Sequence, residues 1–216
     1  MKKNVIISNL FNNLNLPNDR VRPWELQYQN LAEKCDADFV NFSITDNGSI
    51  SKNYAKVLSS RYNEKQTVIK MNQLAVLDEI DKCFSKGYEW VFAMDADILI
   101  NSNADFDLAR CDKSTVYFAS INKNLSGRLE FLSNLKNDFL EKHSLKYGNQ
   151  GVLLINKIIW NLIKNILSNY EEISKHTKST EERALFTHID QNILSIALTL
   201  KNIEIEKIPN KENLFV

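Results

Sequence analysis

The sequence predicts an α/β fold in which a mostly parallel sheet is flanked by helices. Residues 90–94 form a continuous apolar run, the pattern of a strand that is covered on both faces. Short apolar runs of this kind alternate along the chain with longer segments whose apolar residues recur at helical spacing. The length of 216 residues suits one well-filled domain, because single α/β domains commonly reach this size.

The composition is that of an ordinary globular protein, with 44% hydrophobic and 25% charged residues. Because 27 basic residues balance 27 acidic ones, we expect no nucleic-acid partner, which would need a basic excess. No stretch approaches the roughly 20 apolar residues of a transmembrane helix, and the first apolar run is too short for a signal peptide. Cys35, Cys83 and Cys111 form neither a disulfide framework nor a zinc spacing. These features favour a soluble, cytoplasmic protein with reduced thiols.

Six short apolar runs are predicted as strands. They are residues 5–7, 37–42, 90–94, 116–121, 152–156 and 203–206. Ser8 and Asn9 follow the first of these runs, where polar residues are a common nucleotide contact in α/β folds. A simple turn of the chain explains Ser8 and Asn9 equally well.

Helices are predicted where apolar residues recur three or four positions apart. They are residues 23–35, 54–61, 71–84, 129–140, 158–170 and 190–200. Pro23 suits a first helical turn, Gly87 suits the stop after the third helix, and Asp190 suits the N-cap of the last one. Lys70 would lie at the start of the third helix, which the helix dipole disfavours unless the lysine reaches an anion such as a diphosphate. The alternative is a solvated surface lysine.

Asp95 and Asp97 follow the buried run 90–94 directly, with one residue between them. In extended chain, residues two apart point to the same side, so both carboxylates face one spot at the end of a core strand. Two like charges held this close repel each other unless a cation lies between them. Mg²⁺ and Mn²⁺ prefer such oxygen ligands, and ligands bind at the strand ends of open α/β sheets. A solvated turn or a helix cap is the alternative, but the apolar residues on both sides favour a metal site.

Asn149 and Gly151 precede the predicted strand 152–156, and Gly148 stands beside them. Glycine permits close approach of the backbone to a ligand or to another segment. The Asn149 amide is suited to hydrogen-bond sugar hydroxyls, although Asn and Gly are also common in tight turns.

The acidic segment resembles a known family. Asp95-Ala96-Asp97 after an apolar strand is similar to the DxD motif of the GT-A glycosyltransferases. The segment from Lys70 through residues 87–90 to the acids resembles the corresponding part of the galactosyl/xylosyl/mannosyl transferase family, and residues 30–40 are weakly similar to the part ahead of that family's second strand.

Two further matches follow in the family's order. Asn149-Gln150-Gly151, with residues 154–156 and Trp160, resembles a strand shared with the glycogenin and lipooligosaccharide galactosyltransferase family. Asp190-Gln191, followed by Leu194, matches the DQ element of both families. Together the matches cover about residues 70–198.

The resemblance implies one GT-A domain over residues 1–216, with a nucleotide-binding half of about 1–100 and a half of about 101–216 that faces donor sugar and acceptor. It implies a nucleotide-sugar donor, with UDP as the expected nucleotide, bound through Mn²⁺ or Mg²⁺. The acceptor would be a hydroxyl of a glycan or glycoconjugate, and the anomeric configuration would be retained. Asp95 and Asp97 would hold the metal and Lys70 would face the diphosphate. The donor sugar would be surrounded by Asn149, Gly151, Asp190 and Gln191, with Asp190 or Gln191 beneath the anomeric carbon.

One feature departs from the family. Many relatives supply a histidine as third metal ligand well after the DQ element, but no histidine follows Gln191 here. A catalytically inactive sugar-nucleotide-binding relative is therefore one alternative. Another is a haloacid-dehalogenase-like Mg²⁺-dependent phosphatase, which also uses Asp-x-Asp after a strand. Its motif normally lies near the start of the chain, whereas some ninety residues precede Asp95. We expect a monomer or a homodimer.

Overall fold

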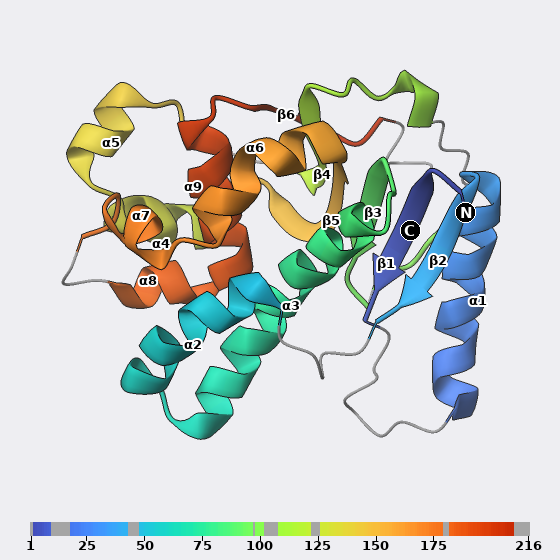
Figure 1. The fold of residues 1–216 in the computed structure, drawn as a ribbon, viewed down its shortest axis with the longest axis horizontal. Helices are drawn as coiled ribbons and strands as arrows, with labels where there is room; N and C mark the ends of the chain where they lie inside the picture. Colours follow the sequence, from blue (N-terminus) through green and yellow to red (C-terminus); the bar gives the residue numbers. More distant parts are fainter. Residues whose placement is uncertain are drawn as a thin grey trace.

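The structure, a computed structural model, describes residues 2–9, 18–42, 48–96, 98–101, 108–121, 126–178 and 182–209. Within these residues six strands form one sheet in the order β2-β1-β3-β5-β4-β6 (Figure 1). The strands are β1 (Asn4–Ser8), β2 (Ala37–Asn41), β3 (Trp90–Met94), β4 (Thr115–Ser120), β5 (Asn149–Asn156) and β6 (Glu204–Lys207). All six predicted strands are therefore present, with ends that differ by a few residues.

The sheet is mostly parallel, as the sequence predicts. Strand β1 pairs in parallel with β2 and β3, and β4 pairs in parallel with β6. Strand β5 lies between β3 and β4 and is antiparallel to both. Because of this reversal, β5 begins at the edge of the sheet where β1, β3 and β4 end. The polar residues before and after these strands are thereby brought to one edge.

Helices flank the sheet. Their bounds are α1 (Asn18–Lys34), α2 (Ser49–Arg61), α3 (Glu64–Ser85), α4 (Ser126–Asn134), α5 (Asn137–Lys142), α6 (Lys157–Leu167), α7 (Tyr170–Ser174), α8 (Glu182–Thr187) and α9 (Ile189–Leu200), with a 3₁₀ turn at Leu108–Arg110. No helix in the described part of the chain combines the length and the apolar character needed to span a bilayer.

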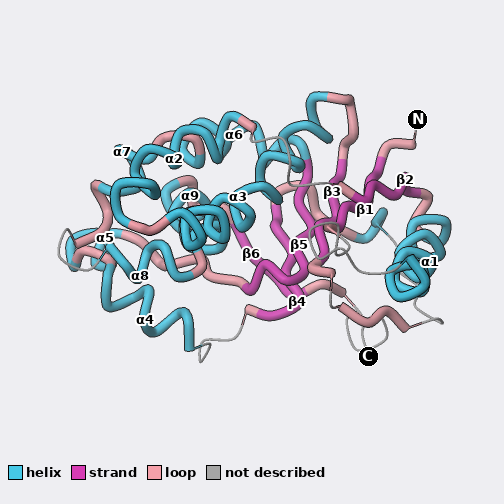
Figure 2. The backbone as a smooth tube through the Cα atoms, turned by 90° about the horizontal axis from the view of Figure 1, so that it is seen from below, coloured by secondary structure: helices cyan, strands magenta, loops and turns pink. Residues whose placement is uncertain are grey.

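Two hydrophobic clusters lie on opposite faces of the sheet. On β3 the side chains alternate, so that Val91 and Ala93 join the larger cluster while Trp90, Phe92 and Met94 join the smaller one. Helices α2, α3, α6, α7 and α9 contribute to the larger cluster, and α1 contributes to the smaller one. Figure 2 shows α1 beside β1 and β2, apart from the other helices. All five β3 residues are buried, which confirms the strand covered on both faces.

Several helix starts differ from the prediction, among them those of α1 and α2. Helix α1 begins at Asn18 rather than at Pro23, so the proline lies in the second turn. Its fixed φ suits a helix, and near the amino end it removes only one early N–H. Helix α2 begins at Ser49, because its first amides are bound by the carboxylate of Asp78 on α3.

Tertiary contacts divide two predicted helices. The predicted helix 129–140 is two helices, since Leu135 forms a bridge with Thr177 and Lys136 N donates to the His176 carbonyl (3.0 Å). The predicted helix 158–170 ends at Leu167, and Asn169 caps a new helix, α7. Helix α8 was not predicted, because its residues carry too little apolar periodicity.

Candidate functional site

Asp95 lies at the sheet edge where β3 ends and β5 begins. Its backbone N–H donates to the Gly151 carbonyl (2.8 Å) and thereby extends the pairing of β3 with β5 by one residue. Its exposed side chain turns toward β5, because a Cβ placed on Gly151 would lie 3.1 Å from Asp95 Oδ2 and 3.1 Å from Asn149 Oδ1. The structure thus brings Asp95, Asn149 and Gly151 together. Asp97 lies outside the described residues.

Glycine at position 151 permits this approach. Asn149 Oδ1 accepts a hydrogen bond from Gly151 N (2.7 Å), so both side-chain oxygens crowd the position where a Cβ would stand. Ordinary contact of a Cβ begins near 3.4 Å, and an alanine would have to push one oxygen away by a few tenths of an ångström.

We therefore expect Gly151→Ala to lower affinity for a ligand bound by Asp95 roughly tenfold, because small displacements of such groups are costly. The midpoint of thermal unfolding should change little, since alanine is no worse than glycine in a strand. Ligand titration and thermal unfolding of the same variant check both parts. Unchanged ligand affinity in Gly151→Ala would show that a side chain at position 151 does not disturb the Asp95 carboxylate.

Asp190 and Gln191 lie in the first turn of α9 and are joined to β5 through Gln150. Gln150 Nε2 donates to the Asp190 carbonyl (3.3 Å), and Gln150 N donates to Gln191 Oε1 (3.4 Å). The sequence prediction of Asp190 as N-cap is wrong, because α9 begins at Ile189 and His188 holds the N-cap position. Asp190 instead lies in the first turn of the helix, where its carboxylate faces the backbone N–H groups of Asp190 and Gln191 and lies within reach of the charges of Asp95 and Lys70.

The charges of Asp190, Asp95 and Lys70 influence one another. The pKa of Asp190 is raised from its ordinary 3.8 to about 7. Burial is the main cause and the charge of Asp95 adds to it, while the backbone N–H of Gln191 and the charge of Lys70 act in the opposite direction. Burial lowers the pKa of Lys70, and the charge of Asp190 opposes that shift. A carboxyl group that titrates near neutrality, beside a second carboxylate and a lysine, is typical of functional sites.

Lys70 is placed differently from the prediction within its helix. Asn63 caps α3 by accepting from Gln66 N (2.9 Å), and the helix begins at Glu64, so Lys70 lies almost two turns inside. Its ammonium donates to the carbonyl of Thr187 (2.9 Å), just before α9 begins. Lys70 is therefore held at the Asp190 side of the site and is not a freely solvated lysine.

Ser8 and Asn9 lie at the same edge of the sheet. Ser8 pairs with Met94 across the parallel ladder, so Asn9 stands beside Asp95 in register. Ser8 is fully buried, and its Oγ makes no hydrogen bond within the described residues; nor does the buried Asn9 Oδ1. Buried polar atoms of this kind are rare without a partner and are suited to a bound ligand or water.

Three contributors to the site were not predicted. Gln150 is buried and links β5 to α9, and only the register of β5 reveals this. Tyr147 is buried near Gln191. Burial raises the pKa of its hydroxyl and the charge of Asp190 raises it as well, while the side chain of Gln191 lowers it. Tyr28 lies on α1, and its hydroxyl donates to the Asp95 carbonyl (2.7 Å).

Comparison with known proteins gives a distant structural likeness. No protein-family model matches the sequence, and no curated protein matches it. A solved structure described as a "crystal structure of a glycosyltransferase involved in the glycosylation of the major capsid of PBCV-1" is similar. It is 12% identical, with a TM-score of 0.40, over 94% of this chain and 80% of that one. That score is too low for its activity to be carried over, so the function must be argued from the residues of this chain.

The described residues suit a divalent cation that protein side chains coordinate only in part. No group of three or more His, Cys, Asp or Glu side chains among them is arranged to hold a metal. Mg²⁺, however, commonly takes one or two carboxylates and completes its shell with water and substrate phosphates. Asp95 is exposed at the strand end, and its charge already raises the pKa of Asp190, so a cation there would offset an excess of negative charge. The residues fit a cation shared with a phosphate ligand rather than one caged by protein alone.

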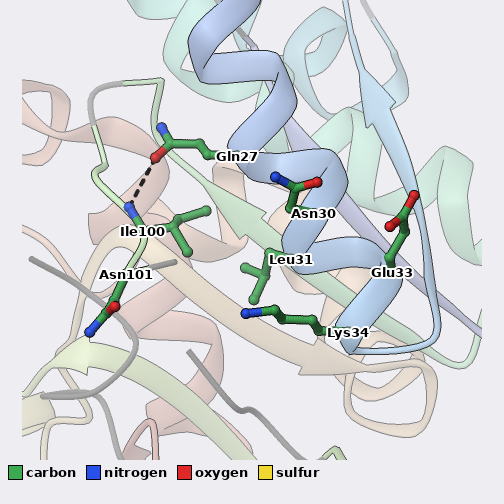
Figure 3. A pocket seen from close by; sticks show the side chains of 7 residues that line it. All are labelled: Gln27, Asn30, Leu31, Glu33, Lys34, Ile100 and Asn101. Atoms are coloured by element: carbon green, nitrogen blue, oxygen red, sulfur yellow. Dashed lines mark hydrogen bonds between the residues drawn. The ribbon is translucent and has the colours of Figure 1, made fainter. Parts of the chain in front are cut away.

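A cavity of about 250 Å³ lies elsewhere, between α1 and residues 98–101 (Figure 3). It is lined by Gln27, Asn30, Leu31, Glu33, Lys34, Ile100 and Asn101. None of the predicted site residues within the described part of the chain lines it. We therefore assign the candidate site to the exposed strand-end edge, where the chemically distinctive residues meet, and not to this cavity.

Proposed function

We propose that the protein transfers a sugar from a nucleotide-sugar donor to a hydroxyl of a glycan or glycoconjugate, with the help of a divalent cation. The observation that carries this proposal is the gathering of Asp95, the 149–151 segment, Asp190 and Lys70 at one edge of the sheet. This edge combines a carboxylate for a cation, a lysine for an anion, and amide and carboxyl groups for sugar hydroxyls.

The leaving group requires stabilisation of negative charge. In the transfer the bond between the anomeric carbon and the diphosphate oxygen breaks, and the diphosphate carries away the electron pair. We expect Lys70 to meet that charge, because its partly buried ammonium is held at the Thr187 carbonyl, within reach of the charge of Asp190. A cation bound at Asp95 would add Lewis-acid stabilisation of the same diphosphate.

The sugar side requires groups that tolerate positive charge. Sugar transfer passes through an oxocarbenium-like transition state, which a nearby carboxylate stabilises. Asp190 is suited to this role once its proton has left, and Gln191 presents an amide oxygen beside it. We propose that one of these two residues lies beneath the anomeric carbon and that the configuration is retained. The acceptor hydroxyl forms the new bond to carbon and gives its proton to an oxygen of the departing diphosphate.

The nucleotide would lie toward β1. The buried oxygens of Ser8 and Asn9 stand beside Asp95 in register and make no hydrogen bond within the described residues, so they are suited to ribose or base groups. The three parts of the donor would then follow one another along the edge of the sheet. The nucleotide is at β1, the diphosphate near Asp95, and the sugar between β5 and α9.

The test is calorimetric titration with UDP and with GDP, each with and without Mn²⁺. We expect the wild type to bind one nucleotide only when the metal is present. Asp95→Asn should lose this metal-dependent binding, at least about 100-fold, because the amide removes the charged ligand. Asp138→Asn, an equivalent change at an exposed position on α5, should bind as the wild type does.

Two outcomes would contradict the proposal. Binding by Asp95→Asn equal to that of the wild type would remove Asp95 from the metal site. Absence of nucleotide binding, together with Mg²⁺-dependent hydrolysis of p-nitrophenyl phosphate, would favour the phosphatase interpretation instead.

A further inference from the structure

We propose that Gln27 and Tyr28 of α1 are positioning residues that hold the described residues of the acidic segment, 95–96 and 98–100, in the conformation in which Asp95 binds the cation. This inference rests on the proposed function, because it gives these two side chains a task in the same metal site. It assigns a role to α1, which supplies none of the predicted site residues.

Tyr28 holds the segment at two points. Its hydroxyl faces the Asp95 carbonyl (2.7 Å) and the Ile98 carbonyl (3.1 Å), one before and one after position 97. The side chain is fully buried, and its ring stacks on Phe39 with centroids 5.9 Å apart and planes 7° from parallel. A ring fixed in this way keeps its hydroxyl in one place, so the two carbonyls are held to a rigid point.

Gln27 holds the segment further along. Its Nε2 donates to the Ile98 carbonyl (3.4 Å), and its Oε1 accepts from Ile100 N (3.1 Å). Figure 3 shows the second of these bonds crossing from α1 to the segment. One primary amide thus pairs with both a carbonyl and an N–H of the same stretch, as a neighbouring strand would.

The attachment points bracket the acidic residues. Four hydrogen bonds from α1 hold three backbone groups, namely Asp95 O, Ile98 O and Ile100 N, and a bond from Ile98 N to Asp95 O (3.3 Å) closes the segment on itself. The direction of a side chain follows from its backbone, so these bonds help to determine where the Asp95 carboxylate points. Groups that orient metal ligands typically change metal affinity 10–100-fold when they are removed.

The packing around the segment leaves its backbone polar groups to α1. Ala96, Ile98 and Ile100 pack, partly buried, against the smaller cluster, whereas Asp95 and Leu99 are exposed. These apolar contacts hold alternate side chains, and the α1 bonds hold the backbone carbonyls and the N–H. Without the two side chains, the cation would have to order these backbone groups as it binds.

The test is Tyr28→Phe, which keeps the stacked ring and removes only the hydroxyl, together with Gln27→Ala. We expect each to raise the Mn²⁺ concentration needed for half-maximal nucleotide binding roughly tenfold, with nucleotide affinity restored at saturating Mn²⁺. Recovery at saturating metal separates positioning from general damage to the fold. Hydrogen exchange at the Ile98 and Ile100 amides, measured without metal or nucleotide, should become faster.

Tyr54→Phe is the matched control. Tyr54 is also fully buried, but it lies on α2 in the other cluster, and its hydroxyl has no hydrogen-bond partner within the described residues. Its loss should leave the Mn²⁺ requirement and the exchange of the 95–100 amides unchanged. Wild-type Mn²⁺ affinity in Tyr28→Phe and Gln27→Ala overturns this inference alone. Absence of metal-dependent nucleotide binding in the wild type overturns the proposed function, and this inference with it.

Discussion

Asp190→Asn is expected to lower turnover at least about 100-fold and, at the same time, to stabilise the folded protein at pH 8. The first effect follows from the loss of a carboxylate beside the reacting sugar, a contribution commonly worth two or more orders of magnitude. The second follows from the environment of Asp190, because burial and the charge of Asp95 both disfavour its ionised form. The measurements are sugar transfer with saturating donor and thermal unfolding of the free protein.

The sign of the pH dependence follows from the pKa. The pKa of Asp190 is raised from 3.8 to about 7 in the folded state, so between about pH 4 and pH 7 the folded protein holds more protons than the unfolded chain. Stability therefore falls as the pH rises through this window. Removing the ionisable group should recover up to about 4 kcal/mol at pH 8 and little at pH 4. The unfolding measurements must contain a chelator, because a bound cation would favour the ionised form of the Asp190 carboxylate.

Asp36→Asn is the control for this exchange of carboxylate for amide. Asp36 is 89% exposed in its side chain and has a positive φ of 48°, a conformation that asparagine also adopts. It should change neither turnover nor the pH dependence of unfolding, since its ion pair with Lys2 is at the surface. If Asp190→Asn lost activity but gained no more stability over the wild type at pH 8 than at pH 4, folding would not disfavour the ionised form of Asp190, and the argument from burial would be wrong.

The sequence predicted the sheet better than the helices. Strand β3 was predicted with the correct bounds, because a run of five apolar residues buried on both faces leaves no ambiguity. The division of residues 126–142 into two helices was not predicted, because it depends on Leu135 and Lys136 bonding to residues 40 positions away. Local periodicity contains no information about such contacts.

The direction of β5 could have been deduced from the order of its motif. Asp95 comes after its strand, whereas Asn149 and Gly151 come before theirs. If both motifs lie at one edge of a sheet, the second strand must run opposite to the first, as β5 does. The roles of Gln150 and Tyr28 were beyond this reasoning, because each depends on which backbone atom of another element faces the side chain.

Asp78→Ala is expected to cause the largest loss of stability, about 3–5 kcal/mol, which for a chain of this length corresponds to roughly 10 °C in the midpoint of thermal unfolding. Asp78 lies on α3 and is 2% exposed. Its carboxylate accepts three backbone N–H groups at the start of α2, from Ile50 (2.8 Å), Gly48 (3.0 Å) and Ser51 (3.2 Å). Differential scanning calorimetry gives the loss directly.

This carboxylate replaces the N-cap of another helix. The N-cap residue of α2 is Gly48, which has no side chain to accept from the helix amides. A Cβ at this position would lie 2.4 Å from Asp78 Oδ1, so the glycine and the aspartate require each other. Without Asp78 the first amides of α2 lose their acceptor inside the protein, and a buried donor left unsatisfied costs about 1–3 kcal/mol.

Asp81→Ala is the matched control, one turn further along α3. Among the described residues, Asp81 accepts one hydrogen bond, from Trp160 Nε1 (2.7 Å), and pairs loosely with Lys164 (4.0 Å). Its side chain is 29% exposed, so water can replace it in part. We expect this variant to lose only about 1 kcal/mol. The difference in stability between Asp78→Ala and Asp81→Ala measures how much the Asp78 carboxylate stabilises the start of α2. Equal losses in the two variants would mean that the first turn of α2 is stabilised by its packing in the larger cluster, and not by the buried carboxylate.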